Sequence, residues 1–415
     1  MRYRDLLRIT EFPVAEITLT PCPKTYIRET HRSRSPDETH AFVQGMAQAV
    51  GMEHVREVTD LDRIGIPVYT CSRMRPDGTT TDHTGKGLSA VQAQVSLTME
   101  AVERYSAEYD ENAYAGDVVR GSFRDLEKMS PILNPEELIL PQFSSYQHNM
   151  TMHWVWGFDL VSRSKLLVPA CAVFHPFHLD DTPVLSTHTN GLASGNTMEE
   201  AVSHAIEEVI ERDAWSINRF TAYASDALFV DDREEYRCIV DVSSKFVNAG
   251  IEVVAKDITS DIGVPVVAAF SNDGVYRSMI TIDGFGAHLD PKVAMIRALL
   301  ELATTRGLFI QKKGIESFRE EYLSGAVIDE FEGDYRFCAY RQKSLAELGE
   351  GYSDDILGDI QMMQSKLTVK GFDRIIAVDL TRQDVGIPTV RVLIPGMEVY
   401  CFDTARIGKR LLDAL

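Results

Sequence analysis

Two stretches with matching residue spacing constrain the fold of this 415-residue chain more than any other feature. The second of them, residues 195–213, predicts a helix. Asn196 and Thr197 supply its start signal, and the acidic residues of its first turn oppose the positive end of the helix dipole. Apolar residues recur at helical spacing and predict a buried side, formed by Val202, Ile206, Val209 and Ile210.

The two stretches share the ending Glu-x-x-Glu-Arg. Its residues are Glu100, Glu103 and Arg104 in the helix predicted at 96–105, and Glu208, Glu211 and Arg212 in the later helix. A single helix of this kind is more often a solvated face joined by i,i+4 pairs. Two equivalent copies instead indicate an internal pseudo-repeat whose carboxylates face a shared cleft.

Carboxylates that converge repel each other unless cations lie between them. Oxygen ligands without Cys or His partners favour magnesium over zinc, and magnesium held by few carboxylates completes its shell with water and phosphate. Arginine binds phosphate with two hydrogen bonds. The residues therefore predict a magnesium–nucleotide site between two helices. On the same face, His204 either packs against a neighbouring Glu or transfers a proton, and the sequence leaves both open.

The net charge of −20 argues against a nucleic-acid-binding protein, because such proteins neutralise phosphates with cations. The six cysteines include no CxxC pair, which indicates reduced thiols in a cytoplasm rather than disulfides or a zinc site. A redox or sulfur-carrier role for one of them stays open. With no apolar leader and no run of membrane-spanning length, we expect a cytoplasmic protein without membrane association.

Helices and strands alternate along the rest of the chain, which predicts a mixed α/β (α+β) fold. A helix capped by Ser35 or Asp37 is expected through Val50, and its start either binds an anion or is an ordinary capped end. The segment 84–89 places a glycine-flanked lysine ahead of the first acidic helix, a weak phosphate-binding signal. Strands are expected at 66–72, 154–161, 166–174, 250–256, 264–271, 278–282, 375–380 and 389–394, and helices at 240–248, 292–312, within 315–355, at 361–370 and at 407–415.

Together with the acidic helices, three further motifs resemble the YcaO superfamily over roughly residues 30 to 400. They are Asn190-Gly191-x-Ala193-x-Gly195-Asn196-x-x-x-Glu200-Ala201, Arg297-Ala298-Leu299-x-Glu301 and Ile394-Pro395-Gly396. The resemblance implies an α/β fold in which a pseudo-repeat of helices packs on mixed sheets, with ATP bound between the repeats. It implies a catalytic domain at 66–400, an N-terminal segment 1–65 that contributes to the ATP site, and a tail at 401–415.

The resemblance also implies the cofactors and the site. YcaO proteins use ATP and Mg²⁺ to phosphorylate the oxygen of a peptide backbone amide. Residues that match magnesium ligands are Glu100, Glu103, Glu208 and Glu211; the catalytic set is Glu103, Glu211, Arg104 and Arg212. Residues that match nucleotide contacts are Ser96, Asn196, Glu200 and Arg297 and, on a looser alignment, Arg32 and Thr39. Thr304 departs from the family, in which many members carry Gln at this position.

The last residues, 410–415, lack the PxPxP tail typical of azoline-forming members. The chain therefore resembles archaeal members that form thioamides, linked to thioglycine in the alpha subunit of methyl-coenzyme M reductase. These act with sulfide and often with a TfuA partner, and we expect a homodimer. Two alternatives stay open: an azoline-forming cyclodehydratase and a non-catalytic ATP-binding scaffold. A two-metal hydrolase ranks last, because neither metal-binding His nor DxD clusters occur.

Overall fold

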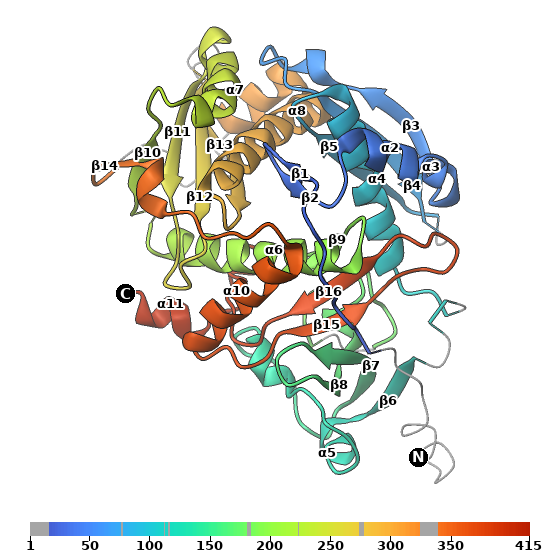
Figure 1. Ribbon diagram of the computed structural model, residues 1–415. Coiled ribbons are helices and arrows are strands. Elements are labelled where there is room, and N and C mark those ends of the chain that lie inside the picture. Colours follow the sequence, from blue (N-terminus) through green and yellow to red (C-terminus); the bar gives the residue numbers. More distant parts are fainter. Residues whose placement is uncertain are drawn as a thin grey trace. The chain divides into compact units, whose positions relative to one another are not determined.

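The computed structural model describes residues 16–415, except 76–77, 112, 115–116, 181–183, 223, 274–277 and 324–338. The chain divides into two compact units, each made of segments that are distant in the sequence (Figure 1). Unit 1 comprises Met1–Cys22, Val102–Ser216 and Ile360–Leu415; unit 2 comprises Pro23–Ala101 and Ile217–Asp359. Cys338, the proline–aspartate pair at 76–77 and part of the charged segment 315–355 lie outside the described residues.

Unit 1 contains an antiparallel sheet in the order β6-β7-β15-β16-β9, and β8 also pairs with β7. Its strands are β6 (Val118–Ser122), β7 (Thr151–Asp159), β8 (Ser164–Pro169), β9 (Leu192–Ser194), β15 (Ile376–Asp379) and β16 (Thr389–Leu393). The predicted pairing of strands at 154–161 and 166–174 is confirmed, because β7 and β8 form a hairpin with Trp154 opposite Pro169. The second strand, however, ends at Pro169, and residues 170–172 form a 3-10 turn.

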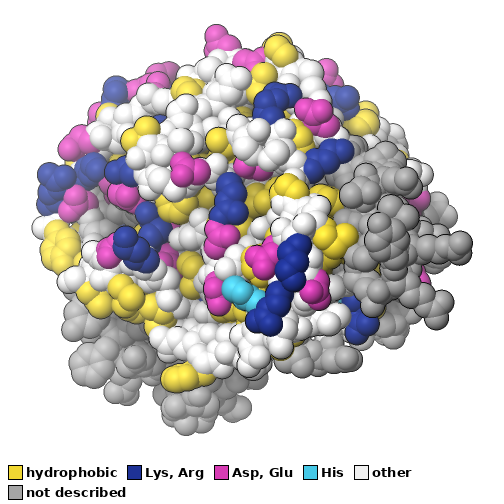
Figure 2. Space-filling model, turned by 90° about the horizontal axis from the view of Figure 1, so that it is seen from below, with side chains coloured by type: hydrophobic (Ala, Val, Ile, Leu, Met, Phe, Trp, Pro, Cys, Tyr) yellow, Lys and Arg dark blue, Asp and Glu magenta, His cyan; other side chains and the backbone are white. Residues whose placement is uncertain are grey.

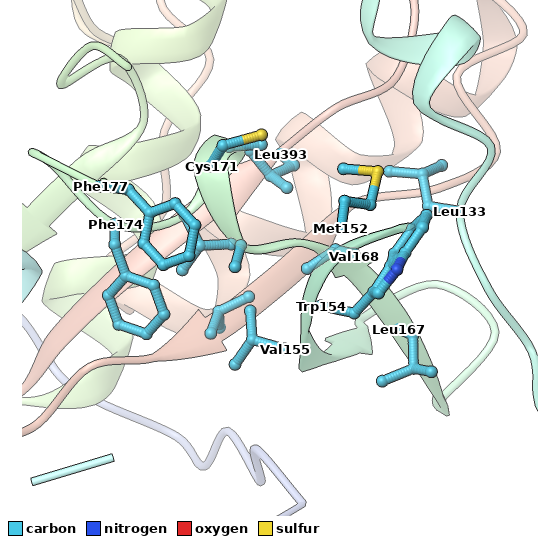
Figure 3. Packing of buried hydrophobic residues seen from close by; sticks show 14 of the residues in the cluster. Leu133, Met152, Trp154, Val155, Leu167, Val168, Cys171, Phe174, Phe177 and Leu393 are labelled. Carbon is cyan, nitrogen blue, oxygen red and sulfur yellow. The ribbon is translucent and has the colours of Figure 1, made fainter. Parts of the chain in front are cut away.

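The core of unit 1 lies against this hairpin. Met152 and Trp154 are two residues apart on β7 and therefore point to the same face of the sheet. Both are fully buried, and the indole Nε1 of Trp154 donates to the carbonyl of Gly121 at 3.0 Å. Figure 3 shows Trp154 and Leu133 at one end of the cluster and Phe174 and Phe177 at the other.

The helices of unit 1 include the later of the two acidic helices. They are the end of α4 (Ala90–Ala107), α5 (Phe123–Leu126), most of α6 (Met198–Phe220), most of α10 (Ile356–Val369) and α11 (Lys409–Asp413). The predicted apolar side of α6 is buried as expected. Val209 on that side lies against Gly191, directly before β9, because a Cβ placed on Gly191 would lie 2.8 Å from Val209; the same Cβ would lie 2.3 Å from the carbonyl of Val392 in β16. Figure 1 shows α6 running across these strands.

Unit 2 contains a hairpin, a three-stranded sheet β3-β4-β5 and a five-stranded sheet β13-β12-β11-β10-β14, in which only the β10–β14 pair among the described strands is parallel. The strands are β1 (Tyr26–Ile27), β2 (His31–Arg32), β3 (Met52–Glu57), β4 (Val68–Met74), β5 (Thr80–Lys86), β10 (Asp226–Phe229), β11 (Glu252–Asp257), β12 (Val266–Asp273), β13 (Ser278–Ala287) and β14 (Gln342–Ser344).

Helices α4 and α8 pack closely on the strands that precede them. The helices of unit 2 are α2 (Pro36–Val43), α3 (Met46–Ala49), most of α4, α7 (Arg237–Asn248) and α8 (Pro291–Leu323). A Cβ on Gly85 of β5 would lie 2.0 Å from the carbonyl of Ala93 in α4. A Cβ on Gly286 of β13 would likewise lie 2.3 Å from the carbonyl of Ala294 in α8. Both helices therefore need a glycine in the strand beneath them.

Three details of the sequence-based assignment need correction. The helix that Ser35 caps ends at Val43, because Gly45 has a φ of 92° and starts a separate short helix. Residues up to Lys86 belong to β5 rather than to a loop at a helix start, and the ammonium of Lys86 lies 3.0 Å from the carboxylate of Glu301. Within 315–355, the described residues 342–348 form β14 and a 3-10 turn rather than a helix.

On the face drawn in Figure 2, basic side chains lie among acidic and apolar ones rather than in a continuous basic surface. Among the described helices, none is both long and apolar enough to cross a membrane.

Candidate functional site

The start of α6 brings together two predicted nucleotide contacts. The backbone amide and the side-chain Nδ2 of Asn196 both donate to one oxygen of Glu200, each at 2.9 Å. The hydroxyl of Thr197 caps the helix by accepting the amide of Glu200 at 3.2 Å. Within the described part of the chain, Oδ1 of Asn196 is buried and has no hydrogen-bond partner. A buried acceptor that is rigidly held and lacks a donor indicates a ligand-binding position.

The two Glu-x-x-Glu-Arg endings have similar local geometry. In α6, the guanidinium of Arg212 lies 3.4 Å from Glu211 and 3.8 Å from Glu208. In α4, Arg104 lies 3.0 Å from Glu103. In each copy the arginine therefore pairs with the glutamate that precedes it. Arg212 is further held by aromatic rings, since its guanidinium carbon lies 5.2 Å from the ring centroid of Trp215 and 5.4 Å from that of Phe402.

A buried arginine connects the two endings. Arg391 lies in the middle of β16, and only 1% of it is exposed. Its pKa is lowered to about 10, mainly by burial; Glu208 and Glu103 raise the pKa, and Arg104 lowers it. These interactions mean that carboxylates from α4 and from α6 act on the same guanidinium. Among the described atoms, Nε and Nη1 of Arg391 have no hydrogen-bond partner.

Seven of the predicted site residues therefore belong to unit 1: Glu103, Arg104, Asn196, Glu200, Glu208, Glu211 and Arg212. Three of these, Glu103, Arg104 and Glu208, act on the same group, because the charge of each shifts the pKa of Arg391. Arg212 in turn joins Glu208 to Glu211. The beginning of α6 holds the remaining two as a separate pair.

The other five belong to unit 2: Arg32, Thr39, Ser96, Glu100 and Arg297. An oxygen of Glu100 lies 3.5 Å from the amide of Thr84 and 3.7 Å from the buried imidazole of His83. Arg297 donates to the carbonyl of Ala287 at 2.7 Å. Arg32 also donates to the carbonyl of His31, and Thr39 to that of Ser35. The nucleotide-binding roles of the first three and of Arg297, and the magnesium-binding role of Glu100, stay predictions.

The donors near Arg391 suit magnesium better than zinc, because they are carboxylate oxygens. Among the described residues, no three His, Cys, Asp or Glu side chains are grouped closely enough to hold a metal ion without other ligands. Magnesium is commonly held by one or two carboxylates while phosphate and water supply the rest. Glu103 and Glu208, together with the cationic side chains around them, therefore fit a magnesium ion that arrives with phosphate groups.

Arg391 is a candidate site residue that was not predicted from the sequence. Its signal was present, because a single charged residue interrupts the apolar run from Val390 to Ile394. Charged residues are rarely buried without a specific reason. The pattern was instead interpreted only as a strand that leads to the Ile394-Pro395-Gly396 motif.

A family model described as YcaO cyclodehydratase, ATP- and Mg²⁺-binding, matches residues 84–398. The chain belongs to the YcaO family. The predicted cofactors, ATP and Mg²⁺, are those of the family, and the prediction from resemblance is confirmed at this level.

Individual relatives agree with the family assignment. An uncharacterized protein of Methanothermobacter thermautotrophicus is 37% identical over 92% of this chain and 98% of its own length. The solved structure of YcaO from Methanopyrus kandleri, bound with AMPPCP and Mg²⁺, is 29% identical with a TM-score of 0.74, covering 94% of this chain and 98% of that one. The mixed α/β fold is thereby confirmed. An uncharacterized protein in the tfuA 3′ region of Rhizobium leguminosarum bv. trifolii is 26% identical over 89% of each chain.

Proposed function

We propose that this chain is an enzyme that uses ATP and Mg²⁺ to activate a peptide backbone amide, to which sulfide then adds to give a thioamide. The observation that carries the proposal is that charges from both acidic helix ends, Glu103 and Arg104 of α4 and Glu208 of α6, act on the buried guanidinium of Arg391. In such an arrangement the guanidinium can bind a phosphate group, and the carboxylates of the two acidic helix ends can bind the metal ion that accompanies it.

The proposed reaction has two steps. The amide oxygen attacks the γ-phosphorus of ATP, and ADP leaves with the electron pair of the broken bond. Hydrosulfide then adds to the amide carbon, the carbon–oxygen bond breaks, and phosphate departs with the original amide oxygen. The amide nitrogen keeps its hydrogen, and the S–H proton leaves with the departing phosphate as hydrogen phosphate, so no oxidant or reductant is needed.

The residues suit this chemistry because the amide oxygen is a weak nucleophile. Such a transfer depends on positioning and on neutralising phosphate charge, and it needs little acid–base work by side chains. Glu103, Glu208 and Glu211 would hold Mg²⁺, which neutralises charge on the transferred phosphoryl group. Arg104 and Arg212 would orient these carboxylates. This division of roles agrees with a site that is rich in Glu and Arg and poor in His.

Asn196 and Glu200 would contact the nucleotide. The amide and Nδ2 of Asn196 are already engaged by Glu200, which leaves its buried Oδ1 directed toward a ligand or a ligand-bound metal. Arg391 joins this proposed set as a phosphate contact, since its Nε and Nη1 lack partners among the described residues.

Azoline formation is the second candidate, because the matched family is described as a cyclodehydratase. In that reaction a Cys, Ser or Thr side chain of the substrate would add to the activated carbon in place of sulfide. The phosphorylation step and its residues would be the same. Only the identity of the nucleophile, and hence the product, would differ.

The substrate and partner are finer proposals. The proposed substrate is a glycine of the alpha subunit of methyl-coenzyme M reductase, modified by a cytoplasmic homodimer. A TfuA protein is the proposed partner, and the relative from the tfuA 3′ region of R. leguminosarum supports this choice.

The test combines the purified chain, a peptide with the target glycine, ATP, Mg²⁺ and sodium sulfide, with and without TfuA. The glycine carbonyl carries a heavy-oxygen label. Thioamide formation predicts that the label appears in phosphate and that sulfur replaces one oxygen in the peptide. Loss of one water from the peptide, with the same transfer of label, would instead establish azoline formation. Phosphate release that never carries the label, or no peptide-dependent release at all, would refute amide activation.

A further inference from the structure

A small cavity lies in unit 1 beside Arg391. It has a volume of about 40 Å³, enough for an occupant somewhat larger than one water molecule. Its polar lining consists of His188, Asn190, Arg406 and Ser186, and apolar residues such as Val209 and Ile394 form the rest. These residues come from the loop before β9, from α6 and from the segment after β16, so three distant parts of the sequence build one cavity.

Two buried guanidinium groups border this region. Arg406 donates to the carbonyl of Ile139 at 2.7 Å and to that of Leu138, and its Nη1 lies 3.3 Å from Nε2 of His188. Arg391 donates to the carbonyl of His188 at 2.8 Å. Within the described chain, neither forms an ion pair with a carboxylate. Burial lowers the pKa of each to about 10, as expected for cations whose charge is incompletely compensated.

The imidazole of His188 faces N–H donors on both sides. Its Nδ1 lies 3.2 Å from the amide of Asn190 and 3.4 Å from Nη2 of Arg391, while Nε2 faces Arg406. Burial, followed by Arg391 and Arg406, lowers the pKa of His188 well below its usual value, so the ring is neutral. A neutral imidazole accepts at only one nitrogen. The cavity wall therefore has more donors than acceptors.

One acceptor in the wall lacks a donor. The side-chain oxygen of Asn190 is buried and has no hydrogen-bond partner among the residues that the structure describes. A suitable occupant must therefore carry negative charge for Arg406, be small, and have one hydrogen to donate to Asn190. Chloride and bromide have the charge but no hydrogen. Water has hydrogens but no charge.

We propose that this cavity binds hydrosulfide, with its charge facing Arg406 and its S–H donated to the side-chain oxygen of Asn190. The inference rests on the proposed function, which consumes sulfide. Arg391 contacts His188 on the wall of this cavity and also interacts with Glu103 and Glu208. The sulfur nucleophile is thus held one side chain away from the proposed phosphate-binding residues.

The decisive variant is Asn190→Asp, which keeps the size of the side chain and adds a negative charge. That charge takes the place of the bound anion beside Arg406. Without ligands, the variant should therefore melt at a higher temperature than the wild type. Sodium hydrosulfide should raise the melting temperature of the wild type, more than bromide does, and should leave that of the variant unchanged. Asn248→Asp on the exposed end of α7 is the matched control and should respond to hydrosulfide as the wild type does.

Kinetics provide the second readout. In Asn190→Asp the KM for sulfide should rise at least tenfold, while the KM for ATP changes less than twofold.

If the variant binds and uses hydrosulfide as the wild type does, the cavity is not the sulfide site, although thioamide formation by the wild type would still support the proposed function. If the wild type binds hydrosulfide in calorimetry and Asn190→Asp does not, but no thioamide forms, the anion site stands and the proposed reaction fails. Equal stabilisation of the wild type by bromide and hydrosulfide would overturn the role of Asn190 as acceptor.

Discussion

The guanidinium of Arg391 donates to the backbone carbonyl of His188 at 2.8 Å, and this bond fixes one side of a group that is otherwise incompletely satisfied. Its remaining charge is balanced only at longer range, by Glu208 and Glu103. A buried cation of this kind costs stability unless a ligand completes its contacts. The arrangement indicates that the protein holds Arg391 for an anionic ligand rather than for its own fold.

Replacement of Arg391 by methionine should therefore separate activity from stability. We expect Arg391→Met to lower peptide-dependent phosphate release by about a hundredfold or more, because one preorganised donor to a phosphate is lost. The melting temperature of the ligand-free protein should stay the same or rise, because a costly buried charge is removed. Phosphate release and thermal melting, measured on the same preparations, check both parts. A variant that unfolds readily would show that Arg391 serves the fold instead.

Neutralising Glu211 should lower turnover strongly without unfolding the protein. In Glu211→Gln the side chain keeps its size, and Arg212 keeps its contacts with Glu208, Trp215 and Phe402. We expect the affinity for Mg²⁺–ATP and the rate of phosphate release to fall at least about tenfold, as for loss of a metal ligand. Glu103→Gln should behave in the same way.

The matched control for these variants is Glu252→Gln, on an exposed position at the start of β11. It should retain wild-type turnover. Full activity of either Glu103→Gln or Glu211→Gln would rule out the proposed magnesium ligands. Circular dichroism of all three variants checks that any loss is local.

The acidic helices illustrate how far the sequence could be interpreted. The burial of Val202 and Ile206 follows from helical periodicity, and the cap at Ser35 follows from a local Ser-x-x-Glu pattern. Both features are encoded within one or two turns of chain. They could therefore be predicted without knowledge of the tertiary fold.

Other features depend on contacts between distant segments and could not be predicted. Arg391 lies more than 180 residues after Glu208, and nothing local in β16 indicates which carboxylates act on it. The glycine-flanked Lys86 gave a weak phosphate-binding signal, yet it ends a strand and pairs with Glu301, 215 residues away. Gly85 beside it lies in the strand on which α4 packs closely. The cavity around His188 also depends on contacts between segments that are distant in the sequence.

The thiols of Cys71, Cys171 and Cys238 should be unreactive in the folded protein. Burial raises the pKa of Cys71 and of Cys171 to about 12 and that of Cys238 to about 11. Because the thiolate is the reactive form, iodoacetamide at about pH 8 should leave all three unmodified, and labelling should increase only as the pH rises toward these values or the chain unfolds. Peptide mapping by mass spectrometry checks this, with urea-unfolded protein as the control. Rapid labelling of any of the three in active protein would reopen a sulfur-carrier role.

Gly191 should be the least replaceable glycine of the loop before β9. It has a φ of +75°, and its carbonyl accepts the amide of Val392 at 2.7 Å. An added Cβ would meet the carbonyl of Val392 at 2.3 Å and the side chain of Val209 at 2.8 Å, so Gly191→Ala combines backbone strain with overpacking. We expect a loss of about 2–4 kcal/mol in the free energy of unfolding.

Gly371 separates these two causes, because it also has a positive φ, of +88°, but an added Cβ there would meet nothing within 4 Å. Gly371→Ala should therefore cost only the backbone strain, about 1–2 kcal/mol. Urea unfolding of both variants measures the difference, which reports the contact of β9 and β16 with α6. Equal losses in the two variants would mean that the loop can move away from Val209, and that α6 does not fix the position of Gly191 beside the His188 cavity.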